Sequence, residues 1–395
     1  MAKLGECFSV IRNGASIRQT DGAGGFPITR IETIADKTIN RGKFGYAGIY
    51  DLAQYRDYIL QDGDILMSHI NSEKHLGKVA LYSKQDDEQI IHGMNLLMLR
   101  ADTQKMIPEY AKYYFESQKF LRQIGRITKK SVNQASFTVT ALKELEIPLA
   151  SIIVQRDISE KLKKVDWLVS LRKQQLAKLD ELVKARFVEM FGDPADNVNN
   201  LSASPMTAIC QIIDGDRGKN YPKQEEFSDS GFCLFLNAKN VTAQGFSFEN
   251  CTYITEEKDA LLRNGKLCRG DVVLTTRGTI GNLAFYDTSV PYENIRINSG
   301  MVILRMNKQV VSEIFFIEQF KMQLDSIKSR IASGSAQPQL PISTMNKIEM
   351  ILPPIELQNQ FAAFVERVDK QKQTVQQSLE KLEVMKKARM QEYFG

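Results

Sequence analysis

Two long stretches of the chain place apolar residues on a seven-residue schedule and contain no glycine or proline. They cover residues 155–191 and residues 358–393. This spacing is typical of helices that bury a narrow apolar seam against another helix, so the sequence predicts two long helices of the coiled-coil kind. The expected seam residues are Leu162, Val165, Val169, Leu176, Leu179 and Val183 in the first helix and Val365, Val368, Val375, Leu379 and Leu382 in the second.

The two helical stretches belong to an internal repeat. Residues 144–192 and 347–395 align without a gap at a constant offset of 203 positions, and both segments end in Phe-Gly. Sequence that recurs at a fixed offset indicates two copies of one structural unit. Polar residues interrupt the seam at Arg172 and Arg186 in the first helix and at Lys372 and Lys386 in the second.

The segments before each helix have the short apolar runs and glycine-rich turns of mixed α/β domains. In the first segment, strands are expected at 26–34, 64–68, 78–82, 95–100 and 145–149, and one helix at 108–124. Residues 201–345 repeat this layout more loosely, with counterparts of four of these strands at 232–240, 270–273, 281–286 and 300–305. Strands and turns agree between the copies while the loops differ, which predicts one scaffold with two different surfaces.

Connectivity then restricts the arrangement. The first helix leads from the first globular segment into the second, and the second helix leaves the second segment. If the two seams bury each other, the helices are antiparallel and a pseudo-two-fold axis relates the repeats, as in an isologous dimer. A coiled coil between two copies of the chain is the alternative.

The expected fold class is therefore α+β, with two similar mixed α/β domains separated by a pair of long antiparallel coiled-coil helices. The divisions that we expect are a first domain at 1–150, a central spacer helix at 151–197, a second domain at 198–353 and a C-terminal spacer helix at 354–395.

The composition is that of a soluble folded protein, with 43% hydrophobic and 25% charged residues in a chain of 395. No apolar run has the length of a membrane span, and the N-terminal residues lack a signal-peptide layout, so we expect a cytoplasmic protein without a membrane partner. The net charge of +5 is compatible with nucleic acid binding but does not establish it.

The sequence has no recognisable motif for catalysis, metal binding or cofactor binding. The five cysteines are expected to be free thiols because none is spaced as CxxC, and the three histidines have no metal-ligand spacing. The chain has no phosphate-binding or dinucleotide-binding loop, no HExxH and no GxSxG. We therefore expect no catalytic residues, no metal site and no cofactor.

Two related domains held apart by helices on the order of 55 Å long suit a ligand that is itself long and repetitive. Duplex DNA is such a ligand, because symmetric binders read half-sites separated by about one helical turn of 34–36 Å. Because the loops of the two domains differ, we expect the domains to read two different half-sites.

Polar loops supply the candidate DNA contacts. Arginine makes bidentate contacts with guanine, while hydroxyl and amide side chains suit phosphates and base edges, so Arg277 is the strongest candidate. The other candidates in the second domain are Lys239, Thr276, Thr279, Arg296, Asn298, Ser333, Ser335 and Gln337. Those in the first domain are Arg30, Lys37, Arg41, Lys43, Ser68, His69, Asn71, Ser72, Lys74, Lys129, Lys130, Asn133 and Gln134.

With its tandem layout, the chain resembles the specificity subunit of type I restriction-modification systems over essentially its whole length. The local signatures are residues 270–274 (GDVVL) leading into 277–281 (RGTIG), and 333–340 (SGSAQPQL) followed by 348–358 (IEMILPPIELQ). The corresponding loop of the first domain, 69–77, departs from this pattern because it is three residues longer and has no arginine.

The resemblance implies a DNA sequence-recognition subunit with two target-recognition domains. Each domain would read one half of a bipartite asymmetric duplex target, and the helix pair would set the gap and dock two modification (methyltransferase) subunits. Those subunits would bring S-adenosylmethionine, and restriction subunits would add ATP-dependent translocation and cleavage. The candidate docking residues are Trp167, Leu168, Phe187 and Phe361, for which packing against the domains is the alternative.

Two other functions remain open at this point. A two-headed scaffold that binds partner proteins would bind with little dependence on salt, whereas phosphate contacts make DNA binding fall steeply as salt rises. An enzyme with an unrecognised site, such as a nuclease, is disfavoured because the sequence has no clustered carboxylates for a metal.

Overall fold

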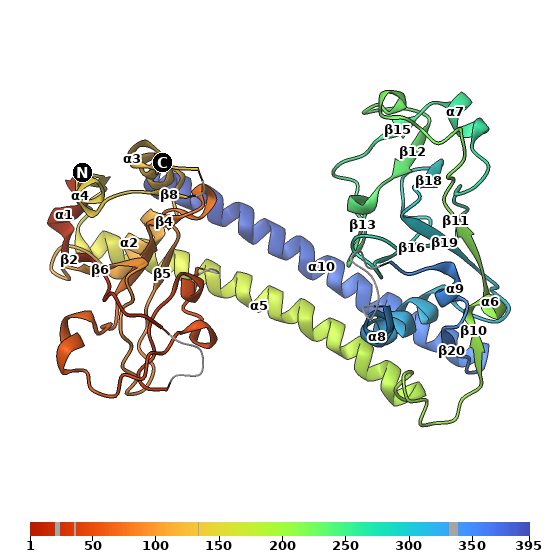
Figure 1. Cartoon of the computed structure of the whole chain (residues 1–395), viewed down its shortest axis with the longest axis horizontal. Coiled ribbons are helices and arrows are strands. Elements are labelled where there is room, and N and C mark those ends of the chain that lie inside the picture. The colour runs from red at the N-terminus through yellow and green to blue at the C-terminus, as the bar shows by residue number, and fades with distance from the viewer. Residues whose placement is uncertain (20–23, 35–36, 133, 332–338) are drawn as a thin grey trace. The chain divides into compact units, whose positions relative to one another are not determined.

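The structure, a computed structural model, describes residues 1–19, 24–34, 37–132, 134–331 and 339–395. The chain divides into two compact units, the first made of Met1–Lys173 and Gln376–Gly395 and the second of Gln174–Val375. Two helices of 40 residues, α5 (Ile152–Phe191) and α10 (Ile355–Phe394), each contribute one half to each unit (Figure 1).

Both units are built on the same four-stranded antiparallel sheet, with the strand order β2-β6-β3-β5 in the first unit and β11-β19-β16-β17 in the second. The register also agrees, since Leu66 lies opposite Ala80 where Val273 lies opposite Ala284. The bounds are β2 (Phe8–Asn13), β6 (Leu96–Ala101), β3 (Ile65–Ser68), β5 (Val79–Leu81), β11 (Cys210–Asp214), β19 (Met301–Met306), β16 (Val272–Thr275) and β17 (Leu283–Phe285).

Shorter elements of the scaffold also occur twice. In the first unit β1 (Ala2–Lys3) pairs with β9 (Glu146–Ile147), and in the second unit β10 (Ala203–Pro205) pairs with β20 (Glu349–Ile351). The matching short helices are α1 (Leu4–Cys7), α4 (Val139–Lys143), α6 (Met206–Ile209) and α9 (Ile342–Met345). The α+β class and the repeated organisation expected from the sequence are confirmed.

The units differ in the elements that surround this scaffold. The first unit has a three-stranded sheet of β4 (Ile70–Asn71), β8 (Ala135–Ser136) and β7 (Lys129–Lys130). The second has a three-stranded sheet of β15 (Tyr253–Ile254), β12 (Cys233–Leu236) and β18 (Ile295–Ile297), the hairpin of β13 (Val241–Thr242) and β14 (Gly245–Phe246), and helix α7 (Glu256–Leu261).

The strand expected at 26–34 is wrong for the first unit. Residues Ile31–Ile34 form a 3-10 helix, although the corresponding region of the second unit contains β12. The Thr33 hydroxyl accepts a hydrogen bond from the Arg30 backbone N–H at 2.8 Å and donates to the Lys43 carbonyl. A local side-chain bond of this kind gives the backbone an alternative to a strand ladder.

The single helix expected at 108–124 is also wrong, because the structure has α2 (Pro108–Phe115) followed by α3 (Gln118–Ile127). Ser117 separates them, and its hydroxyl accepts from the Phe120 backbone N–H at 3.2 Å, which caps the start of α3. The second unit has one helix at the equivalent place, α8 (Glu313–Ile331).

A repeated glutamine joins each long helix to its globular part. The Gln155 side-chain oxygen accepts from the Ile107 backbone N–H at 2.9 Å, and its amide nitrogen donates to two backbone carbonyls. Gln358 does the same with the Ser312 backbone N–H at 3.0 Å and two carbonyls. Both side chains are fully buried, so their polar atoms are satisfied within the fold.

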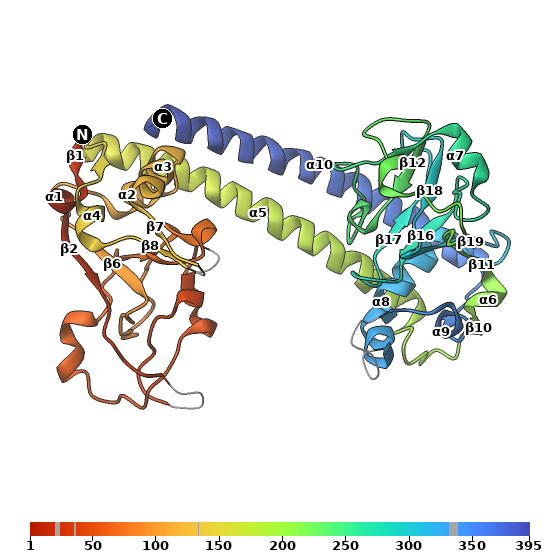
Figure 2. The ribbon, with the colours of Figure 1, turned by 45° about the horizontal axis from the view of Figure 1, so that its top comes forward.

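The end of each long helix packs into a globular core. In the first unit the Phe394 ring of α10 lies 5.2 Å from the Tyr110 ring and 5.8 Å from the Tyr114 ring of α2. The C-terminal carbonyl of Gly395 accepts from Lys119 of α3, and the C-terminus lies beside α3 in both views (Figures 1 and 2). In the second unit the Phe191 ring of α5 lies 5.1 Å from that of Phe315.

Ion pairs within each unit give the direction of the helix pair. In the first unit Asp166 binds Lys386 at 2.5 Å, and in the second unit Asp180 binds Lys372 at 2.7 Å. Partner numbers fall on α10 as they rise on α5, so the helices are antiparallel, as expected. Arg172 donates to the Ser378 hydroxyl, so Arg172, Lys372 and Lys386 each have a partner on the other helix, whereas Arg186 forms its ion pair with Glu189 on its own helix.

The expected seam residues face inward to different degrees. Those that are buried are Leu162, Val165, Val183, Val365, Val368, Val375 and Leu379, while Val169, Leu176, Leu179 and Leu382 are half-buried. Leu162 belongs to the same core cluster as Phe394, and Val183 to the same cluster as Phe315. Near the helix ends the seam therefore packs against the globular parts as well as the opposite helix.

Candidate nucleic-acid interface

Three loop segments of the second unit meet at the end of its main sheet. The backbone N–H groups of Thr276 and Arg277 both donate to the Gly300 carbonyl, at 2.9 and 3.2 Å, just before β19 begins. The Leu340 N–H donates to the Thr276 carbonyl at 2.9 Å. Asn298 completes the group, because its side-chain oxygen accepts from the Gly300 N–H at 2.9 Å.

The backbone of the 276–281 loop is held firmly while the Arg277 side chain is exposed. The Thr275 hydroxyl donates to the Thr279 carbonyl and accepts from the Asn282 N–H, which ties the loop across its base. Gly281 has φ +93°, and a Cβ there would lie 2.2 Å from the Leu324 side chain, so this turn requires glycine. Within the described residues, Arg277 is exposed and has no acidic partner.

Sequence reasoning missed a second group of cations beside this loop, which we call the Arg217 cluster: Arg217, Lys219 and Arg263. The Arg217 guanidinium is half-exposed, pairs with Asp214 at 3.0 Å and donates to the Ser299 carbonyl, next to Asn298. Lys219 and Arg263 are exposed.

The buried Asp216 carboxylate joins the ends of the Arg217 cluster. It accepts from the Gly218 N–H at 2.7 Å and from the Arg263 N–H at 2.8 Å. The sequence signal for this cluster was the turn 214–220, in which two cations follow a glycine and two aspartates.

The first unit brings its two predicted loops together in the same way. Strand β8 pairs with β4 on one side and β7 on the other, so that Asn71 lies opposite Ala135 and Lys130 lies opposite the same residue. Lys130 also pairs with Glu73 at 2.9 Å, with both side chains exposed. Exposed neighbours that could reach a ligand are Ser72, Lys74, Lys129 and Gln134.

The predicted basic group of the first unit is only partly available. Arg41 makes two hydrogen bonds to the Glu88 carboxylate, at 2.9 and 2.6 Å, and the bond from Arg41 lowers the pKa of Glu88 to about 2. That pairing neutralises the Arg41 charge, whereas Arg30, Lys37 and Lys43 are exposed. Thr33 holds Arg30 and Lys43 together through the two bonds described above.

The structure contradicts the prediction for Arg296. Its side chain is 6% exposed, pairs with Asp259 at 2.5 Å and donates to the backbone carbonyls of Asp259, Leu262 and Asn264. These bonds occupy the guanidinium within the fold, so the prediction that Arg296 contacts DNA is wrong.

Three further candidates are buried, which also contradicts their prediction as contacts. Ser68, His69 and Thr276 are between 2% and 5% exposed. Burial lowers the pKa of His69 to about 4, so its imidazole is neutral at physiological pH and offers no charge to a phosphate. The Thr276 hydroxyl donates to the Gly300 carbonyl and stabilises the loop.

The remaining candidate contacts stay predictions. Lys239 and Thr279 are exposed, and Asn71 and Asn298 are half-buried. Asn133, Ser333, Ser335 and Gln337 lie outside the described residues.

Two of the four expected docking residues are wrong. Phe187 and Phe361 are fully buried, with ring centroids 5.3 Å apart in the core of the second unit. Each lies four residues from a seam position, Val183 or Val365, and therefore on the same helix face. Trp167 is 61% exposed, and it remains a candidate together with the half-buried Leu168.

The described residues contain neither a metal-ion cluster nor a membrane-spanning helix. No group of three or more histidine, cysteine, aspartate or glutamate side chains in that part of the chain could hold a metal ion. No helix there is both long enough and apolar enough to span a membrane.

Two copies of one α+β unit, each with its own cluster of exposed polar loops, define a tandem binding protein. The family model for the type I restriction modification DNA specificity domain matches residues 1–181 and again residues 205–384. The chain belongs to this family, as a type I restriction-modification specificity subunit.

Individual relatives agree with this assignment. The chain is 28% identical over 399 residues to a putative type I restriction enzyme MjaX specificity subunit of Methanocaldococcus jannaschii, covering 98% of this chain and 90% of that protein. The fold is similar to the crystal structure of a type I S subunit from M. genitalium, with a TM-score of 0.55, 16% identity, and coverage of 100% of this chain and 95% of that one. A structure from a study of type I system assembly has a TM-score of 0.56 at 15% identity, covering 100% of this chain and 96% of that one.

Proposed function

We propose that the chain is a non-catalytic DNA-recognition subunit in which each unit reads one half of a bipartite, asymmetric duplex target. The helix pair sets the gap between the halves and docks two methyltransferase subunits, and restriction subunits join through the complex. The chain itself uses no cofactor and acts in the cytoplasm. Methylation, ATP hydrolysis and cleavage come from the partner subunits.

One observation carries this proposal. The loops that follow β3 and β16 stand at the ends of equivalent strands and meet equivalent second segments, yet their sequences differ in length and charge. Arg277 and Thr279 are exposed in one loop, whereas in the other Ser72 and Lys74 are exposed and Asn71 is half-buried. A common scaffold with different exposed donors is what two different half-sites require.

Replacing Arg277 with alanine is expected to weaken selection at one half-site only, by about 1–3 kcal/mol if the guanidinium makes a bidentate base contact. The backbone of its loop is tied by Thr275 and Gly300, so the fold is expected to persist. Binding of the complex with its methyltransferase subunits to duplexes mutated in either half measures the effect. A matched control is Lys308→Ala, because Lys308 is exposed beyond the opposite end of β19. Loss at both half-sites alike would contradict a base-reading role.

Replacing Arg217 with alanine is expected to act differently. A phosphate contact carries no sequence information, so affinity for all duplexes falls together and the salt slope decreases by about one. Titrations at several salt concentrations measure both quantities. Binding that ignores salt in the unmodified complex would instead favour the protein-binding scaffold.

A further inference from the structure

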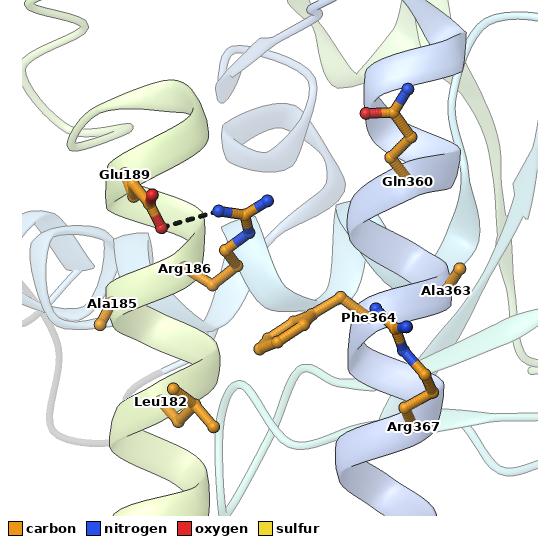
Figure 3. A pocket seen from close by; sticks show the side chains of 8 residues that line it. All are labelled: Leu182, Ala185, Arg186, Glu189, Gln360, Ala363, Phe364 and Arg367. Atoms are coloured by element: carbon orange, nitrogen blue, oxygen red, sulfur yellow. Dashed lines mark hydrogen bonds and ion pairs between the residues drawn. The ribbon is translucent and has the colours of Figure 1, made fainter.

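An open groove of about 920 Å³ lies between α5 and α10 within the second unit (Figure 3). Leu182 and Ala185 of α5 and Ala363 and Phe364 of α10 give it an apolar lining. Leu182 is 45% exposed and Phe364 is half-buried, so apolar surface remains open to solvent between the two helices.

Of the two arginines at the edges of the groove, one is paired with a carboxylate of the described residues and the other is not. Arg186 pairs with Glu189 at 2.8 Å, and its guanidinium lies 5.9 Å from the centre of the Phe364 ring. Arg367 on the opposite wall is exposed and has no acidic partner among the described residues. The groove therefore combines an apolar floor with one cation whose charge is not compensated.

The internal repeat supplies a comparison for each wall. The residues that line the groove on α5 have counterparts 203 positions later, on the part of α10 that lies in the first unit. These counterparts are Met385, Ala388, Arg389 and Glu392, and Arg389 pairs with Glu392 at 2.6 Å, as Arg186 pairs with Glu189. This wall therefore has the same apolar and charged residue types in both units.

The opposite wall has changed. Its counterparts on α5 are Glu160 and Lys161 in place of Ala363 and Phe364, with Lys161 paired to Asp157 at 2.7 Å. Arg367 corresponds to the exposed Lys164. The first unit therefore presents a charged surface where the second presents an apolar floor.

We propose that the groove of the second unit docks an amphipathic helix of a protein partner, and that the equivalent surface of the first unit does not offer the same site. The partner helix inserts an apolar side chain between Leu182 and Phe364 and places a carboxylate against Arg367. A groove between two helices accepts a third helix in this way. Identifying the partner as a methyltransferase subunit rests on the proposed function, and the first such subunit then binds at the second unit.

A second copy of this chain fits the groove poorly. A two-fold interface places the same patch on both sides, so Arg186 and Arg367 of each copy would face those of the other. Glu189 is the acid that lines the groove, and it is already paired. A partner with its own carboxylate is therefore the complementary occupant.

Titration of the full chain with the purified methyltransferase subunit of the same system, followed by native mass spectrometry, tests the proposal. The unmodified chain is expected to bind the first subunit about tenfold or more tightly than the second, and Arg367→Glu is expected to remove that difference by weakening the first step. Lys164→Glu is the matched control at the equivalent position of the first unit and is expected to leave the first step unchanged. Both positions are exposed, so neither change is expected to alter the melting temperature.

A graft tests the same idea by gain of binding. The double change Glu160→Ala with Lys161→Phe places the apolar floor in the first unit and is expected to tighten the second step. Equal affinity of both steps in the unmodified chain, indifference of the first step to Arg367→Glu, or self-association of the chain through the groove would each overturn the proposal.

DNA selection by the saturated complex is a separate readout. If sequence selection persists while the groove variants have no effect, the docking proposal fails and the proposed function stands. If the two binding steps behave as expected but no duplex is selected, the proposed function fails instead.

Discussion

Replacing Phe394 with alanine is expected to destabilise the first unit by about 3–5 kcal/mol, because it removes a buried aromatic side chain from a packed core. Phe394 is 1% exposed and lies against Tyr110 and Tyr114, which stand 284 and 280 residues earlier in the chain. The loss therefore opens the contact between α10 and α2. Amide hydrogen exchange resolved by peptide measures it, with faster exchange expected in β2, β6 and α2.

The repeat provides the control for this change. Phe191→Ala is expected to speed exchange in the second unit, since Phe191 packs against Phe315 and Phe361 there. Gln391→Ala changes an exposed neighbour of Phe394 and is expected to have little effect. Unchanged exchange in the first unit of the Phe394 variant would mean that α10 does not hold that unit together.

Adding seven residues to α5 alone is expected to destabilise both units, whereas adding seven to both helices restores stability and lengthens the gap in the DNA target. The insertion points are the junction of Lys173 and Gln174 on α5 and the junction of Val375 and Gln376 on α10. The antiparallel pairing places these two junctions nearly opposite each other. One heptad keeps the seam on the same face and adds about 10 Å, or about three base pairs of duplex.

Mapping the bound or methylated sequence of each insertion variant measures the gap, and thermal unfolding measures the rescue. An insertion of five residues in both helices is the control, because it turns the seam away from its partner. Altered half-sites, or an unchanged gap in the doubly lengthened chain, would contradict the idea that the helix pair is the spacer.

The sequence predicted the scaffold well because its signals are local or repeated. The seam around Leu162 and Val365 predicted the long helices, and the sequence repeat at an offset of 203 positions predicted a second copy of the unit. Buried apolar runs located β3, β5 and β6 because these strands are covered on both faces.

Site residues were harder to predict because exposure depends on distant partners. Arg277 lies in the loop after β16, whereas Arg296 lies within β18. The Arg296 guanidinium is bound by Asp259, which comes 37 residues earlier in the chain. The same applies to Arg217, whose position beside Asn298 follows from the folded turn at Ser299. Phe187 and Phe361 could have been placed correctly, since their four-residue spacing from Val183 and Val365 puts them on the seam face.

Selection from a random duplex library by the chain bound to its methyltransferase subunits tests the central claim most directly. Two reading units predict enrichment of two short, different sequence elements separated by a gap of constant length and variable sequence. In the Arg277→Ala variant one element is expected to weaken while the other persists. A library without enrichment, or with one contiguous element, would contradict the account.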